Sequence, residues 1–93
     1  MILAKVIGSV WSTRKDENLV GLKFLAVQPV NMLDESQQLQ PFIAADYMGA
    51  GVGETVLVVS GSSARNALKN MSIPVDATIV GIVDGQELLG EEG

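Results

Sequence analysis

Two serines and an arginine occupy positions where the chain could bind an anion. Ser62 and Ser63 follow an apolar run and Gly61, and Arg65 comes two residues later. The first N–H groups of a helix attract negative charge, and Arg65 would add to that attraction. A small-anion or metabolite-binding module is therefore one hypothesis for this chain. In the simpler alternative, Ser62 or Ser63 caps the helix and Arg65 forms an ion pair between subunits.

Nucleophilic catalysis by either serine would require a neighbouring base. The chain contains no histidine and no cysteine, so the candidate bases are Lys5, Lys15, Lys23 and Lys69. No spacing in the sequence selects one of these lysines. A hydrolase is thus a third hypothesis, and we predict no catalytic residue and no enzymatic activity.

Four carboxylates could supply a pair for acid–base chemistry or a site for a hard cation: Asp46, Glu54, Asp76 and Asp84. All four stand at the ends of predicted strands, beside turn residues. Aspartate in such positions commonly accepts hydrogen bonds from the local backbone. We therefore predict turn formation by these residues, with no metal site and no cofactor.

The glycine-rich segment Gly49-Ala50-Gly51-Val52-Gly53 invites comparison with a dinucleotide fingerprint. That fingerprint needs its glycines after a strand and at the start of a helix. Here the glycines precede a strand, and no phosphate-binding lysine follows them. We predict a tight turn in which glycine supplies a positive φ or lets another backbone approach closely.

Five segments have the apolar character of strands, and one has the character of a short helix. The predicted strands are Ile2–Thr13, Leu19–Pro29, Leu39–Tyr47, Thr55–Ser60 and Ala77–Val83, and the predicted helix is Ser63–Asn70. The first two strands would form a hairpin with its tip at residues 15–18. Pro41 restricts its position to an edge or to the start of a strand. These elements predict an all-β fold, a small five-stranded OB-like β-barrel with one short helix.

The exterior of this barrel is expected to be apolar. Alternation along the first strand places Leu3, Ile7 and Trp11 on its outer face. The run Thr55–Ser60 does not alternate, which indicates that both of its faces are covered. Because 47% of the residues are apolar in a chain of only 93, part of the exterior is expected to lie between subunits.

Composition restricts the remaining function classes. The chain fits one domain, and its net charge of −5 with only six scattered basic residues argues against nucleic-acid binding. A charge within the first five residues leaves no room for a secretory or membrane-spanning segment, so no membrane partner is expected. The absence of cysteine fits a cytoplasmic protein.

Several motifs, in this order, carry a resemblance to a known family. They are Met1-Ile2-Leu3-Ala4-Lys5-Val6-Ile7-Gly8, Val10-Trp11-Ser12-Thr13-Arg14-Lys15, Leu19-Val20-Gly21-Leu22-Lys23-Phe24-Leu25, Ala45-Asp46, Gly49-Ala50-Gly51-Val52-Gly53-Glu54, Val59-Ser60-Gly61-Ser62-Ser63-Ala64-Arg65, Pro74-Val75-Asp76-Ala77 and Gly81-Ile82-Val83-Asp84. Together they cover nearly the whole chain. The sequence resembles the EutN/CcmL family, the pentameric vertex proteins of bacterial microcompartment shells.

The resemblance implies a structural protein and not an enzyme. Its members form cyclic homopentamers of OB-like barrels, which cap the vertices of a cytoplasmic shell whose facets are built from hexameric shell proteins. Residues 1–84 would form the vertex domain, and residues 85–93 a short acidic C-terminal tail. The type of microcompartment, its enzymes and the lining of any central pore are left open.

The resemblance and the predicted strands together suggest two groups of interface residues. Candidates for the fivefold axis or the subunit seam are Gly49, Ala50, Gly51, Gly53, Glu54, Ser62, Ser63 and Arg65. Apolar candidates on the outer faces of strands are Leu3, Ile7, Trp11, Val56 and Val58. An ion pair between Glu54 and Arg65 across the seam is also expected.

Overall fold

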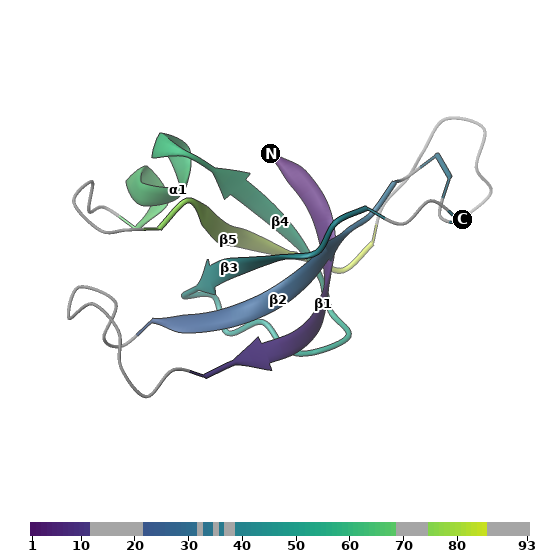
Figure 1. Ribbon diagram of the computed structural model, residues 1–93, viewed down its shortest axis with the longest axis horizontal. Helices are drawn as coiled ribbons and strands as arrows, with labels where there is room; N and C mark the ends of the chain where they lie inside the picture. Colours follow the sequence, from purple (N-terminus) through teal and green to yellow (C-terminus); the bar gives the residue numbers. More distant parts are fainter. Residues whose placement is uncertain (12–21, 32, 35, 37–38, 69–74, 86–93) are drawn as a thin grey trace.

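The computed structural model describes residues 1–11, 22–31, 33–34, 36, 39–68 and 75–85. Within them lie five strands and one short helix (Figure 1). In chain order these are β1 (Ile2–Val10), β2 (Lys23–Pro29), β3 (Phe42–Asp46), β4 (Thr55–Ser60), α1 (Ser62–Ala67) and β5 (Ala77–Val83). The predicted hairpin tip at 15–18 lies outside the described residues.

The five strands close into a barrel in the order β1-β2-β3-β5-β4, with β4 paired back to β1. All neighbours are antiparallel except β3 and β5, which run parallel. The predicted all-β class with a small barrel is confirmed. Both β4 and β5 have their predicted bounds, whereas β3 is shorter at each end. It begins only after Pro41, because proline has no N–H to donate to a neighbouring strand.

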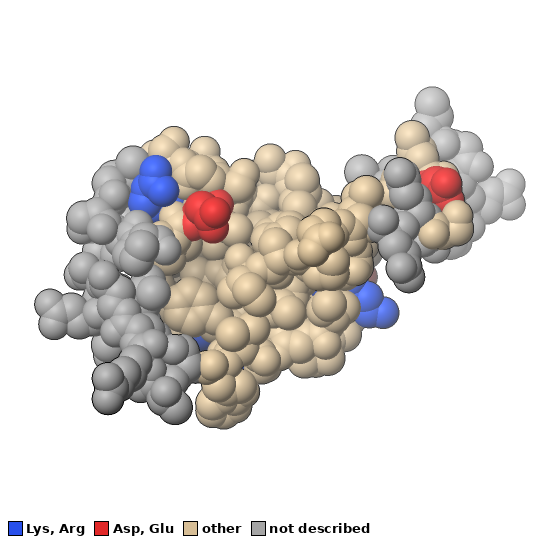
Figure 2. All heavy atoms as spheres, in the orientation of Figure 1, with Lys and Arg blue, Asp and Glu red and all other residues tan. Residues whose placement is uncertain are grey.

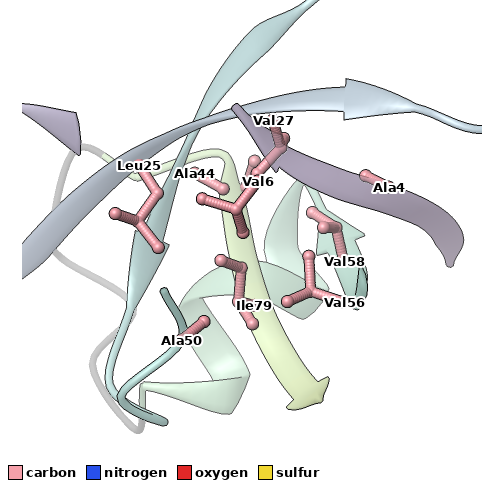
Figure 3. Close-up of a cluster of buried hydrophobic side chains, with 10 residues drawn as sticks. Ala4, Val6, Leu25, Val27, Ala44, Ala50, Val56, Val58 and Ile79 are labelled. Carbon is pink, nitrogen blue, oxygen red and sulfur yellow. The ribbon is translucent and has the colours of Figure 1, made fainter. Parts of the chain in front are cut away.

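The interior of the barrel is filled by small and aliphatic side chains (Figure 3). Its buried members are Ala4, Val6, Leu25, Val27, Ala44, Ala50, Val56, Val58, Ala77 and Ile79, with Phe42 and Ile82 packed against them. A five-stranded barrel has a narrow interior, so compact side chains from every strand can fill it. The large aromatics Trp11 and Tyr47 are 89% and 50% exposed.

Two predicted interface residues belong to this interior. Val56 and Val58 are 0% and 2% exposed, so neither can contact another subunit. The prediction for them was wrong because β4 is apolar on both faces, and its pattern does not show which face is inside. The register of β4 with β1 places Leu57 opposite Leu3, and both are partly exposed on the outer face.

A bulge in β1 interrupts the alternation predicted for this strand. Val6 pairs with Val27, but Gly8 pairs with the next residue of β2, Ala26, so Ile7 is the additional residue. Beyond the bulge, Ser9 lies opposite the buried Leu25. Because paired residues share a face of the sheet, the faces of β1 are exchanged after Ile7. The prediction that Trp11 lies on the same face as Ile7 by simple alternation was therefore wrong.

A second apolar cluster fixes α1 against the outside of the barrel. It contains the buried residues Ala45, Ala64 and Val75, with Leu22, Phe24, Val59 and Leu68 packed against them. The Thr78 hydroxyl donates a hydrogen bond to the Ala64 carbonyl at 3.0 Å. The helix thus covers one part of the outer wall. In the described part of the chain, no helix is long and apolar enough to span a membrane.

The start of α1 differs from the prediction. Its N-cap is Gly61, at φ 63°, and no side chain caps the helix. Ser62 is the first helical residue, so capping by Ser62 or Ser63 was wrong. Glycine replaces a serine cap here because the chain turns from β4 into the helix through a positive φ, which a residue with a Cβ rarely adopts.

Candidate subunit interface

The connection from β3 to β4, residues 46–54, is held in shape by its first residue. Asp46 is only 3% exposed. One carboxylate oxygen accepts the Met48 N–H at 2.8 Å, and the other accepts the Ala50 N–H at 2.9 Å. Both oxygens are therefore engaged with local backbone, which confirms the predicted turn role of this aspartate.

Lys23 on β2 also holds the connection from β3 to β4 in place. Its ammonium group donates to the Ala50 carbonyl at 2.9 Å, and Lys23 lies opposite Asp46 in the sheet. Ala50 is fully buried and forms part of the barrel core. The prediction that Ala50 lies at the fivefold axis or the seam was wrong, because the residue is fully buried in the core of its own protomer.

The second half of the connection is a tight turn joined to β1. The Glu54 carboxylate accepts the Gly51 N–H at 2.6 Å, and the Glu54 N–H donates to the Gly51 carbonyl at 3.1 Å. Gly53 and Glu54 each form a backbone hydrogen bond with Val6, both of 2.9 Å. Gly49 and Gly53 have φ angles of 84° and 93°. The predicted role of glycine in supplying a positive φ is confirmed at these two positions.

This connection presents apolar side chains to solvent. Tyr47, Met48 and Val52 are 50%, 43% and 63% exposed. Its polar side chains Asp46 and Glu54 are turned toward backbone groups of the same segment. Tyr47, Met48 and Val52 were not predicted as interface candidates. Large apolar residues in a glycine-rich turn were the signal that could have identified them.

Ser62, Ser63 and Arg65 all lie on the short helix α1. Ser62 and Ser63 are exposed, and the helix that they begin is only six residues long. The Arg65 guanidinium donates to the Val75 carbonyl at 3.3 Å. The partners seen for Glu54 and Arg65 both lie within the protomer. Their ion pair across the seam stays a prediction.

The exterior of the barrel contains a broad uncharged area. Figure 2 shows one face on which the described charged side chains gather near the two ends, with none in the middle. Exposed apolar residues on or next to the strands include Ile7 at 49%, Val10 at 39%, Trp11 at 89% and Ile43 at 46%. Among the described residues, no three histidine, cysteine or acidic side chains are grouped to hold a metal ion.

The described residues therefore combine a small closed barrel with large apolar side chains on its outside and no grouped metal ligands. Such a surface suits a structural protein that assembles with other protein subunits.

Comparisons with known proteins identify the family. Residues 1–84 match the family described as "Ethanolamine utilisation protein EutN/carboxysome", so the chain belongs to the EutN/CcmL family. It is 49% identical over 86 residues to the carboxysome shell vertex protein CcmL of Synechococcus elongatus, covering 90% of this chain and 84% of that protein. It is 44% identical over 87 residues to the microcompartment shell vertex protein PduN of Salmonella typhimurium, covering 90% and 96%.

Solved structures agree with this assignment. The pentameric microcompartment shell protein GrpN from Rhodospirillum rubrum superimposes with a TM-score of 0.83 at 42% identity, over 95% of this chain and 99% of GrpN. CcmL from Gloeobacter violaceus gives a TM-score of 0.84 at 39% identity, over 95% and 90% of the two chains. The chain is thus a structural shell protein of the vertex class, and not an enzyme, in the shell of a cytoplasmic bacterial microcompartment.

Proposed function

We propose that five copies of this chain form a ring that caps a vertex of a microcompartment shell and contacts hexameric shell proteins of the same compartment. A flat hexagonal lattice cannot enclose a volume unless pentagons are inserted at its corners. The pentameric GrpN, of nearly the same length and fold, supports the ring. The observation that carries the proposal is the likeness to this pentameric protein over 95% of the chain. A ring would give each copy two neighbours to cover its exposed apolar residues.

A ring needs two different contact surfaces on each protomer, since neighbours meet head to tail. Leu3 and Ile7 of β1 are proposed for one of them, and Trp11, which directly follows β1, is proposed as a separate contact residue. Two groups of residues are proposed for the fivefold axis or the second surface. They are Gly49, Gly51, Gly53 and Glu54 in the connection from β3 to β4, and Ser62, Ser63 and Arg65 in α1. On β4, Leu57 is proposed as the interface residue instead of Val56 and Val58, because it lies on the outer face opposite Leu3.

The proposed division of the chain follows the fold. Residues 1–84 contain all five strands and would form the vertex domain, with β5 ending at Val83. Residues 85–93 would form a short acidic tail, of which only Gly85 is among the described residues. Removing residues 86–93 is a simple way to examine this division, since ring formation should survive it.

Mass and fluorescence together test the ring. Trp11 is the only tryptophan and is 89% exposed in the protomer. If five copies pack around it, light scattering should give five times 9.8 kDa, and Trp11 emission should shift to longer wavelength when dilution separates the subunits. The variant Trp11→Phe provides the blank for the emission measurement. A monomeric mass at micromolar concentration would contradict the proposal.

A further inference from the structure

Two side chains of opposite charge hold the middle of the connection from β3 to β4, residues 46–54, all of which are described. The Asp46 carboxylate accepts the Ala50 N–H at 2.9 Å, and the Lys23 ammonium donates to the Ala50 carbonyl at 2.9 Å. Hydrogen bonds to charged groups are stronger than those between neutral groups. Both polar backbone groups of Ala50 are therefore fixed. Figure 1 shows this connection as the teal trace between the end of β3 and the start of β4.

The side chains that this connection presents to solvent are large and apolar. Its two carboxylates, Asp46 and Glu54, accept N–H groups of the connection itself. Tyr47, Met48 and Val52 are 50%, 43% and 63% exposed. Three such side chains on one ordered connection are a feature expected of a surface that another protein covers.

Lys23 acts on this surface through one carbonyl group. The lysine is exposed, whereas Ala50 is fully buried in the core (Figure 3). Without the ammonium, the Ala50 carbonyl would lose its donor, and a buried carbonyl without a partner is unfavourable. The connection would then shift to bring this carbonyl to water. Such a shift would displace Met48 and Val52, which lie two residues before and two residues after Ala50.

The adjacent copy of this chain is the partner that fits this surface. GrpN, to which the chain is similar over 95% of its length, is pentameric. A ring joins two different surfaces of each protomer. The side of the barrel offers the other surface, where Ala26 of β2 pairs with Gly8 of β1 and Ile43 of β3, and Ile43 is 46% exposed. One chain thus carries both an ordered apolar connection and an apolar sheet face, as a head-to-tail contact requires.

We propose that the adjacent protomer of the ring covers Tyr47, Met48 and Val52. Lys23 is a positioning residue for this contact, and it acts through the Ala50 carbonyl. This inference rests on the proposed pentamer. It adds three apolar contact residues to the candidates from the sequence and gives a lysine of β2 a role in assembly.

The absence of cysteine from the chain allows a direct test of the contact. In the separate variants Val52→Cys and Tyr47→Cys, a maleimide reagent should react about tenfold more slowly in the ring than in subunits separated by dilution, because the neighbour covers the thiol. Gln40→Cys, at an exposed position before β3 and so at the opposite end of that strand from Asp46, is expected to react at similar rates in both. Equal rates in the ring and in separated subunits for both Val52→Cys and Tyr47→Cys would overturn the proposal.

The positioning role of Lys23 is tested by removing its charge. Lys23→Met keeps an apolar side chain of similar length and should raise the concentration at which the ring dissociates by about tenfold, measured by light scattering on dilution. Lys23→Arg can still donate to the Ala50 carbonyl and should restore most of the loss.

A double variant distinguishes positioning from simple stabilisation of the protomer. In Lys23→Met with Val52→Cys, at a concentration where the ring persists, the slowing of the maleimide reaction should decrease, because the connection has shifted away from the neighbour. A lysine that only stabilises the protomer would leave this slowing unchanged, and that result would overturn the positioning role.

The same measurements separate this inference from the proposed function. If the wild type is a ring and both cysteines react as they do in separated subunits, the contact proposal is wrong and the pentamer stands. Slowing that occurs only after hexameric shell proteins are added would likewise overturn it, in favour of a hexamer contact. A monomeric wild type would contradict the proposed function itself.

Discussion

The connections from β2 to β3 and from β3 to β4 are both polar, turn-rich segments, yet the structure uses them differently. In residues 46–54, Asp46 and Lys23 both bind Ala50, and the turn at Gly53 pairs with β1. In residues 31–40, the β2–β3 arm, the hydrogen bonds of the described side chains join residues within the arm or join Leu39 to Gln28 of β2. The first connection is part of the barrel, and the second is attached to it.

Burial is the reason for this difference. Asp46 and Ala50 are 3% and 0% exposed, so losing their hydrogen bonds would leave buried polar atoms without partners. Asp34 and Ser36 are exposed, so water replaces any bond that is lost. Similar side-chain-to-backbone bonds therefore differ in their contribution to stability. The comparison predicts large effects of substitution in residues 46–54 and small ones in the arm.

The largest effect is expected for Asp46→Ala. It removes both acceptors and leaves the Met48 and Ala50 N–H groups unpaired, which should lower the free energy of unfolding by about 3 kcal/mol. Urea unfolding at a fixed protein concentration measures this change. Asp46→Asn keeps one acceptor and should lose less. The exposed control is Asp84→Ala. If Asp46→Ala lowers the free energy of unfolding by less than this control does, the Asp46 carboxylate does not hold the connection.

An intermediate effect is expected for Gly53→Ala. Gly53 has a φ of 93°, and a Cβ at this position would meet no atom within 4 Å. The penalty therefore comes from the backbone alone and should be about 1–2 kcal/mol. Gly85→Ala is the matched control, since Gly85 also has open space around it and no positive φ. Equal midpoints of thermal unfolding for the two variants would contradict the expectation.

The smallest effect is expected for Asp34→Ala in the arm. The substitution removes the acceptor for the N–H and hydroxyl of Ser36, but both groups can bind water instead. We expect a change in the free energy of unfolding of separated subunits below about 0.5 kcal/mol, measured by chemical denaturation at high dilution. A loss close to that of Asp46→Ala would remove the distinction between the two connections.

Much of the fold could be predicted from the sequence because local signals and tertiary structure agree. The β-branched runs Thr55–Ser60 and Ala77–Val83 are strands with the predicted bounds. Asp46 and the two positive-φ glycines act in turns as their residue types predict. Each of these properties depends on a residue and its immediate neighbours, which is the information that a sequence contains.

The candidate site was predicted less well because it depends on orientation. Val56 and Val58 were assigned to the outside, but the closed barrel turns them inward. The bulge at Ile7 exchanges the faces of β1, and Gly8 beside it was the sequence signal that could have predicted the bulge. Gly61, and not a serine, begins α1, because the path from β4 requires a positive φ there.

The sequence by itself determined the secondary structure, the turn chemistry and the family, since each is encoded in residue types and their order. Only the tertiary structure decided which apolar residues are core and which are surface. In a chain that is apolar on both faces of its strands, closure of the barrel and the register of each pair choose the inside. That choice leaves Ile7 and Ile43 exposed on the outside of the barrel.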